Sequence, residues 1–203
     1  MVAIIDYGVG NLFSLKCSFA AIGYEAQVTS DPAEIDRADR VILPGVGAFE
    51  DAAKKLRDTG LDREVIRQAE AGKPLMGICL GMQLLFENSY EYGLHRGLSL
   101  LKGEIRPISE RIPDNLKIPQ MGWNSLNIKK QSPLFAGIQN GDYVYFVHSY
   151  SAVGCEESLL ATTEYGAELT ACVGKNHIYG CQFHPEKSGR IGLKILKAFC
   201  EIK

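Results

Sequence analysis

The sequence predicts an α/β fold with a mostly parallel central sheet and helices on both of its faces. Short apolar runs alternate with helical stretches through the first eighty residues, which is typical of parallel strands that are buried on both sides. After residue 100, glycine and proline punctuate shorter β-type runs, so antiparallel additions are expected late in the chain. The 203 residues contain no repeat and no linker, and we expect one domain over residues 1–203.

Strand and helix signals alternate through the first half, with two consecutive helices expected between the third and the fourth strand. The predicted strands are short and cover residues 2–5, 24–29, 40–43 and 75–78. Asp6 closes the first strand, Pro44 and Gly45 end the third, and the fourth runs directly into the next predicted helix. Apolar periodicity or amphipathic charge patterns predict helices over residues 12–22, 49–57, 61–71 and 80–87, with a short helical turn opened by Asp31 and Pro32.

The second half is expected to be mainly β-structure that ends in a helix. The predicted strands cover residues 143–150, 159–163, 170–174 and 178–183, and an amphipathic helix is expected over residues 188–201. In open parallel sheets, ligands bind at the carboxyl ends of the strands. Three loops at such ends are therefore the candidate functional segments, namely residues 44–48, 78–81 and 183–187.

Composition argues against several classes of protein. Twenty-two basic and twenty-four acidic side chains give a net charge of −2, which does not suit a nucleic-acid partner or an anionic membrane surface. No apolar run reaches the roughly 18 residues of a membrane span. The first residues lack a basic leader, so we expect no signal peptide and a cytoplasmic location.

Neither a metal site nor a cofactor site is expected. The six cysteines form no C-x-x-C pair, and the four histidines show no ligand spacing, so free thiols and no metal are predicted. Residues 7–11 are rich in glycine but lack the third glycine of a dinucleotide fingerprint. No cofactor is therefore predicted.

Residues 77–81, Gly-Ile-Cys-Leu-Gly, lie between a predicted strand and a predicted helix. They have the G-x-S-x-G spacing of a nucleophile elbow, with Cys79 in the serine position. A tight turn would direct the thiol into the cleft, and the glycines remove Cβ atoms that would clash. At a helix N-terminus, free N–H groups and the helix dipole favour a thiolate. The alternative is a buried thiol that packs as a small hydrophobic group.

Residues 183–186, Phe-His-Pro-Glu, contain the candidate partners of this thiol. Proline keeps the residue before it extended, and residues two apart in an extended segment point to the same side. We therefore expect His184 and Glu186 to face one cleft, with the carboxylate orienting the imidazole. The alternative is a surface turn with solvated side chains.

Residues 44–48, Pro-Gly-Val-Gly-Ala, follow a predicted buried strand. Glycines allow the backbone N–H groups of such a loop to turn toward a ligand. Acyl transfer needs these donors where the oxyanion develops, alongside the N–H group of the residue after the nucleophile, here Leu80. A simple turn that ends the strand explains the segment equally well when it is considered alone.

Taken together, these motifs resemble those of the triad (class I) glutamine amidotransferases. The resemblance depends on Gly-Ile-Cys-Leu-Gly-Met-Gln at residues 77–83 and His-Pro-Glu at residues 184–186. It implies a single-domain, flavodoxin-like sandwich. Within the family, the sequence is similar to the glutaminase subunits of imidazole glycerol phosphate synthases, through residues 6–12, 44–49, 121–124, 145–150 and 183–188.

The resemblance implies that Cys79 attacks the side-chain amide of L-glutamine. His184 would act as base and then as acid, Glu186 would hold His184, and water would hydrolyse the glutamyl thioester to release glutamate. The family pattern also implies the oxyanion donors, which are Leu80 and the peptide of Val46 and Gly47. The residues that would recognise the amino-acid part of glutamine are Gln83, Glu91, His148, Ser149 and Tyr150.

A protein partner is implied by the same resemblance. Ammonia would pass through a protected tunnel into a (β/α)₈-barrel synthase subunit, with which the chain would form a heterodimer. The products would be imidazole glycerol phosphate and an aminoimidazole carboxamide ribonucleotide, in histidine biosynthesis. Family members typically need this partner for substantial glutaminase activity. The implied interface residues are Asn11, Trp123, Asn124, Tyr145 and Lys187, and Trp123 could equally be a partly buried core aromatic.

Three other interpretations remain open from the sequence. The chain could be a paralogous glutaminase that supplies a different synthase, for example in nucleotide-sugar modification. It could be a flavodoxin-like cysteine hydrolase that acts on esters or peptides. A binding subunit without activity is the third possibility, and the intact set of Cys79, His184 and Glu186 argues against it.

Overall fold

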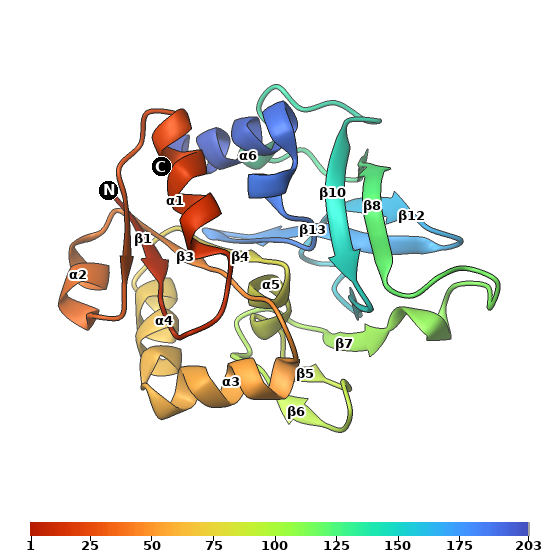
Figure 1. Cartoon of the computed structure of the whole chain (residues 1–203), viewed down its shortest axis with the longest axis horizontal. Helices are drawn as coiled ribbons and strands as arrows, with labels where there is room; N and C mark the ends of the chain where they lie inside the picture. Colours follow the sequence, from red (N-terminus) through yellow and green to blue (C-terminus); the bar gives the residue numbers. More distant parts are fainter. Residues whose placement is uncertain (203) are drawn as a thin grey trace.

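An eight-stranded sheet forms the centre of the protein in a computed structural model that describes residues 1–202 (Figure 1). Its parallel strands are β1 (Val2–Ile5), β2 (Ala26–Thr29), β3 (Arg40–Leu43), β4 (Leu75–Ile78) and β14 (Ile178–Cys181). Its antiparallel strands are β9 (Asn127–Ile128), β12 (Leu159–Glu164) and β13 (Glu168–Lys175). The order β2-β1-β3-β4-β14-β13-β12-β9 confirms the predicted parallel half with antiparallel additions.

Helices cover both faces of this sheet (Figure 1). One face carries α1 (Leu12–Ala21) and α6 (Gly189–Glu201), and the other carries α2 (Pro32–Arg37), α3 (Phe49–Asp58), α4 (Leu61–Glu70) and α5 (Leu80–Leu84). The alternation of side chains along β1 builds the two cores, because Val2 and Ile4 pack toward α1 and α6 while Ala3 and Ile5 pack toward the other helices. The α/β prediction is thus confirmed.

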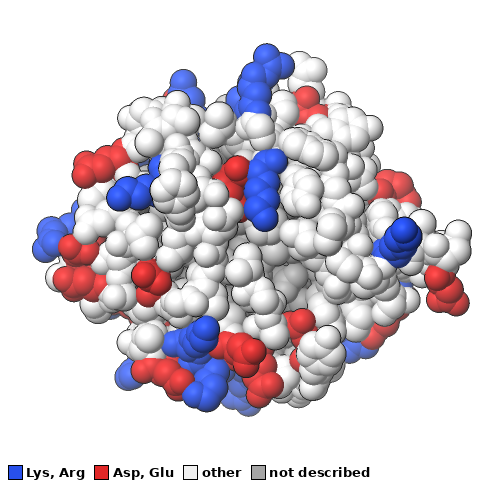
Figure 2. Space-filling model, viewed as in Figure 1, with Lys and Arg blue, Asp and Glu red and all other residues white. Residues whose placement is uncertain are grey.

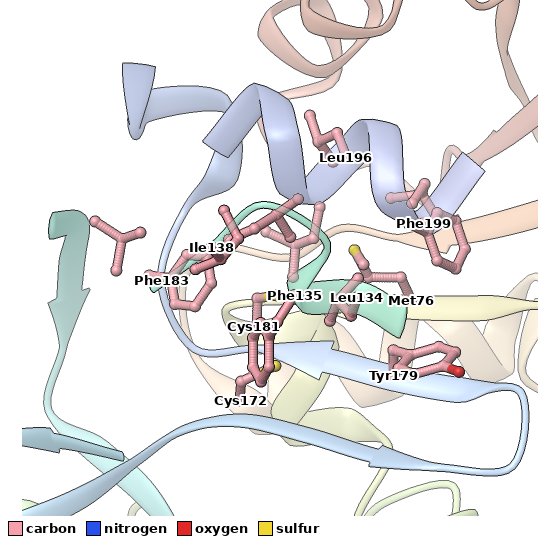
Figure 3. Close-up of a cluster of buried hydrophobic side chains, with 14 of the residues drawn as sticks. Met76, Leu134, Phe135, Ile138, Cys172, Tyr179, Cys181, Phe183, Leu196 and Phe199 are labelled. Atoms are coloured by element: carbon pink, nitrogen blue, oxygen red, sulfur yellow. The ribbon is translucent and has the colours of Figure 1, made fainter. Parts of the chain in front are cut away.

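The core beneath α6 joins the last helix to the middle of the sheet. Figure 3 shows Leu196 and Phe199 of α6 above Tyr179 and Cys181 of β14, with Cys172 of β13 beside them. The 3₁₀ turn η2 (Pro133–Phe135) contributes further buried side chains to the same cluster. This packing fixes the strand from which the segment of residues 183–186 emerges.

Two smaller sheets differ from the sequence expectation. The predicted strand of residues 143–150 is broken at Ser149, because its first part pairs with β8 (Gln120–Ser125) and the part beyond the break pairs with β7 (Glu104–Pro107). The two-stranded sheet contains β8 (Gln120–Ser125) and β10 (Tyr143–His148). The four-stranded sheet contains β5 (Asn88–Ser89), β6 (His95–Arg96), β7 and β11 (Tyr150–Val153). The 3₁₀ turn η1 (Ile108–Glu110) directly follows β7.

The helix after Cys79 is also shorter than predicted. It ends at Leu84 instead of residue 87, because the carbonyl groups of Leu84 and Leu85 accept hydrogen bonds from the loop of residues 98–101. The N–H group of Leu98 donates to Leu84, and those of Leu100 and Leu101 both donate to Leu85. The predicted strands 24–29 and 178–183 are similarly trimmed to Ala26–Thr29 and Ile178–Cys181.

Residues 1–202 include no helix that combines the length and the apolar character of a bilayer span. Lys203, the last residue of the predicted domain, lies outside the described residues.

Three glycines allow the elbow around Cys79 to form. A Cβ atom on Gly81 would lie 1.9 Å from the Leu43 carbonyl oxygen, and one on Gly77 would lie 2.5 Å from the Gly81 carbonyl oxygen. A Cβ atom on Gly45 would lie 2.6 Å from the Gly81 nitrogen. The loop after β3, the end of β4 and the start of α5 are therefore in backbone contact, which only glycine permits.

We predict that Gly81→Ala destabilises the protein, although alanine usually favours a helix. The added methyl group must displace the Leu43 backbone, and we expect a loss of about 1–3 kcal/mol in the free energy of unfolding, or more. Chemical denaturation measures this quantity. The exposed substitution Lys16→Ala in α1 is the control and should change it by less than about 0.5 kcal/mol. Equal stability of the two variants would contradict the close contact.

Candidate active site

Cys79 occupies a strained turn at the carboxyl end of β4. Its backbone has φ 54° and ψ −113°, a conformation that L-residues rarely adopt and that typically marks a functional site. The Cys79 N–H group donates to the Cys181 carbonyl oxygen of β14 at 2.7 Å, which anchors the turn to the neighbouring strand. The predicted strand–turn–helix elbow is therefore present, with the thiol at the N-terminus of α5.

His184 and Glu186 are in direct contact, as the sequence predicts. His184 Nδ1 lies 2.8 Å from Glu186 Oε1, and both side chains are almost completely buried. The expectation of a strand-like segment is only partly correct. His184 is extended, with φ −98° and ψ 98°, but Glu186 belongs to the 3₁₀ turn η3 (Pro185–Lys187). The Ser188 hydroxyl donates to the His184 carbonyl oxygen at 2.6 Å and stabilises this turn.

The environment of His184 favours its charged form. Burial lowers the pKa of the imidazole, but the influence of the nearby Cys79 and of the Glu186 carboxylate outweighs burial and raises this pKa to about 9. Within residues 1–202, His184 Nε2 is buried without a hydrogen-bond partner, so this nitrogen is free to exchange a proton in the cavity. The imidazole thus lies between a sulfur and a carboxylate that stabilise its positive charge.

A cavity of about 260 Å³ opens above Cys79. This volume is slightly below the usual range of drug-sized ligand pockets, about 300–1,000 Å³, and suits a small metabolite. The cavity brings together every predicted oxyanion and substrate residue with the thiol and the imidazole, while Glu186 lies behind His184. The lining residues are Val46, Gly47, Cys79, Leu80, Gln83, Glu91, Pro119, Val147, His148, Ser149, Tyr150 and His184.

Backbone donors reach this cavity from two segments. Leu80 is the first residue of α5, so its N–H group has no intrahelical acceptor. In the described part of the chain, the N–H groups of Val46 and Gly47 donate no hydrogen bond to another residue. Gly47 has φ +95° and open space where a Cβ atom would be. These groups are the candidate oxyanion donors.

Glu91 and Gln83 are already engaged with the protein. Glu91 Oε2 accepts a hydrogen bond from the Phe49 N–H group at 2.6 Å, so the carboxylate binds the N-terminus of α3. Burial raises the pKa of Glu91, and the Phe49 bond opposes this shift. Gln83 Nε2 donates to Gln182 Oε1 at 3.0 Å and to the Tyr150 carbonyl oxygen at 3.3 Å.

The His148 ring supports the cavity wall and is not free to bind a ligand through its nitrogens. Nδ1 lies 2.8 Å from the Tyr150 carbonyl oxygen, and Nε2 lies 2.9 Å from the Gln120 side-chain amide. Burial lowers the pKa of His148 to about 4, so the ring is neutral at pH 7. Both ring nitrogens of His148 are thus engaged within the protein, and recognition of glutamine by residues 148–150 stays a prediction.

The predicted interface residues are only partly clustered. Trp123 is 55% exposed and forms an edge-to-face contact with Tyr145, with ring centroids 6.1 Å apart, and Lys187 Nζ lies 5.9 Å from the centroid of Tyr145. Asn124 instead binds the Glu164 and Ser125 backbones. Asn11 lies before α1, and its side chain makes no capping hydrogen bond. The surface over β8 and β10 is largely free of charged side chains (Figure 2).

Gln182 is a site residue that the sequence reasoning missed. Its Nε2 amide group donates to Cys79 Sγ at 3.7 Å, while its Oε1 accepts from Gln83. The thiol also lies 3.8 Å from the Val147 carbonyl oxygen. The available signal was the position of Gln182, two residues before His184 in an extended segment and therefore on the same side.

Comparisons with known proteins agree with this geometry. The family model "Glutamine amidotransferase class-I" matches residues 3–202. The "Imidazole glycerol phosphate synthase subunit HisH" of Caldanaerobacter subterraneus is 53% identical and covers 100% of this chain and 98% of its own length. The protein of the same name from Wolinella succinogenes is 49% identical, with 100% of both chains covered.

Solved structures share the fold at low identity. A crystal structure of a glutamine amidotransferase has a TM-score of 0.77 at 19% identity and covers 99% of this chain and 98% of its own. A chain of PurLQS from Thermotoga maritima has a TM-score of 0.76 at 20% identity, with 98% and 97% covered. With the family model and the full-length relatives, the chain belongs to the class I glutamine amidotransferases, among the HisH subunits of imidazole glycerol phosphate synthase.

Proposed function

We propose that Cys79, His184 and Glu186 are the catalytic triad with which this chain hydrolyses L-glutamine and supplies ammonia for histidine biosynthesis. One observation carries the proposal: a strained cysteine and a buried histidine–carboxylate pair share one small cavity. The family match supports a reaction at the side-chain amide of glutamine. The same match argues against an ester or peptide hydrolase and against an inactive binding subunit.

The reaction follows from the positions of these groups. The Cys79 thiolate attacks the amide carbon, and the N–H groups of Leu80 and of the Val46–Gly47 segment stabilise the oxyanion. His184 Nε2 donates its proton to the departing nitrogen, which leaves as ammonia and gives a glutamyl thioester. Water then attacks the thioester, His184 takes a proton from it, and glutamate is released with the thiolate restored. The net reaction converts glutamine and water into glutamate and ammonia.

Recognition of the amino-acid part is assigned to the other end of the cavity. The Glu91 carboxylate suits the α-ammonium group, because one of its oxygens binds Phe49 and the other remains available. Polar groups that can bind the α-carboxylate group of glutamine come from Gln83, Ser149 and Tyr150. The His148 ring holds the Tyr150 backbone in place.

A heterodimer with a (β/α)₈-barrel synthase subunit is part of the same proposal. Ammonia released into water would be protonated and lost as a nucleophile, so a covered path into the partner is required. The uncharged surface with exposed Trp123 and Met121 on β8, beside Tyr145 and Lys187, supports a docking face of this kind. Asn11 and Asn124 complete the assigned interface.

We further propose that residues 1–203 form one glutaminase domain in the cytoplasm. The family model covers almost the entire chain. All six cysteines are free thiols, which is the usual state in a reducing compartment.

Cys79→Ala is expected to abolish glutaminase turnover. Loss of the nucleophile should reduce kcat by at least about 10³-fold, because neither His184 nor the oxyanion donors can replace a covalent step. The assay measures glutamate formation by the complex with the synthase subunit. Cys17→Ala, which removes an exposed thiol of α1, is the matched control and should keep full activity. Turnover by Cys79→Ala at the rate of the control would contradict the proposed triad.

The pKa of His184 should fall when Cys79 is replaced. Cys79 is a main cause of the raised value of about 9, so Cys79→Ala should shift the imidazole toward its ordinary pKa near 6.5. NMR titration of labelled histidine side chains measures this shift. Cys17→Ala should leave His184 unchanged. An unaltered pKa in Cys79→Ala would show that the sulfur and the imidazole are not coupled.

Trp123→Ala is expected to weaken binding of the synthase subunit. An exposed aromatic anchor typically contributes about 2 kcal/mol or more, which corresponds to a rise in Kd of about 30-fold. Calorimetric titration with the barrel subunit measures Kd. Tyr92→Ala removes another exposed aromatic side chain, from the segment between β5 and β6, and should have little effect. Equal Kd values for both variants would contradict the assigned face.

A further inference from the structure

The Tyr7 hydroxyl, which is not part of the proposed triad, contacts the loop of residues 44–48, called the oxyanion loop below. Tyr7 follows β1, is 4% exposed, and donates a hydrogen bond to the Pro44 carbonyl oxygen at 2.7 Å. Burial and the nearby Cys79 raise the pKa of this hydroxyl, so it keeps its proton and remains a donor at neutral pH. The side chain therefore links the first strand to the segment that follows β3.

The first part of the oxyanion loop has little freedom to move. A Cβ atom on Gly10 would lie 2.9 Å from Pro44 Cβ, so the proline ring is packed against the loop after β1. Gly45 is in backbone contact with Gly81 of α5. The hydrogen bond from Tyr7 also orients the loop. Its acceptor is the carbonyl group of the Pro44–Gly45 peptide, so the bond sets the plane of that peptide.

The loop is also held at its other end, but not in the middle. The Phe49 N–H group is bound by Glu91 Oε2 at 2.6 Å. Between the two anchors, Val46 is 42% exposed, and no atom lies within 4 Å of the position that a Cβ atom on Gly47 would take. The direction of the Val46–Gly47 peptide therefore depends on the two points at which the loop is fixed.

We propose that Tyr7 is a positioning residue for the oxyanion donors, acting through the Pro44 carbonyl group on the peptide of Val46 and Gly47. The proposal depends on the function proposed above, in which these N–H groups stabilise the oxyanion. Donors must lie 2.7–3.1 Å from the developing charge, and an error of about 1 Å costs up to about 10²-fold in rate. Tyr7 is not among the residues that line the cavity, so its effect should appear in kcat more than in KM.

The test compares Tyr7→Phe with Tyr179→Phe in the complex with the synthase subunit. Both changes remove a hydroxyl group from a buried tyrosine, and Tyr179 lies in the core beneath α6. For Tyr7→Phe we expect kcat for glutamine hydrolysis to fall about 10- to 100-fold, with KM within about threefold of wild type. Tyr179→Phe should keep kcat within about twofold.

A second measurement distinguishes an effect on the oxyanion loop from an effect on the reactivity of the thiol. Alkylation of Cys79 by iodoacetamide is followed on the Cys79 peptide by mass spectrometry. Displacement of iodide by a thiolate forms no oxyanion, so Tyr7→Phe should react at the wild-type rate. The proposal is overturned if kcat of Tyr7→Phe stays within twofold of wild type, if only KM changes, or if alkylation slows as much as turnover. An inactive wild-type complex would overturn the proposed function itself, and this assignment with it.

Discussion

The backbone contact between the loop after β3 and the start of α5 is the constraint on which the site depends. Gly45, Gly77 and Gly81 bring three segments closer than any side chain would allow, and Cys79 lies among them in a strained turn with positive φ. Such a conformation costs about 1–3 kcal/mol, which the buried packing of β4 and α5 must offset. As a result, the thiol, the N–H group of Leu80 and the loop of residues 44–48 lie at one end of the sheet.

Electrostatics then gives the two histidines of the cavity opposite roles. His184 lies between Cys79 and the Glu186 carboxylate, and its pKa is raised to about 9, so it holds a proton at neutral pH. The buried ring of His148, with a pKa of about 4, stays neutral and supports the Tyr150 segment. One imidazole is therefore ready to transfer a proton, while the other is a structural support.

Local sequence patterns predicted the parts of this site that depend on local geometry. The glycine spacing around Cys79 identified the elbow, and the proline after His184 correctly indicated an extended residue in contact with Glu186. Contacts between distant segments could not be predicted in this way. The early end of α5 depends on residues 98–101, and the break at Ser149 depends on pairing with two different strands. Burial of the His148 ring, like the bond from Gln182 to the thiol, required the assembled sheet.

The central claim is that glutamine forms a covalent intermediate on Cys79 in the cavity it shares with His184. Acid quenching of the complex during turnover, followed by peptide mass spectrometry, tests it most directly. The account predicts a glutamyl group on the peptide that contains Cys79 and on no other cysteine peptide. Sustained turnover with no adduct on that peptide, or with the adduct on another thiol, would contradict it.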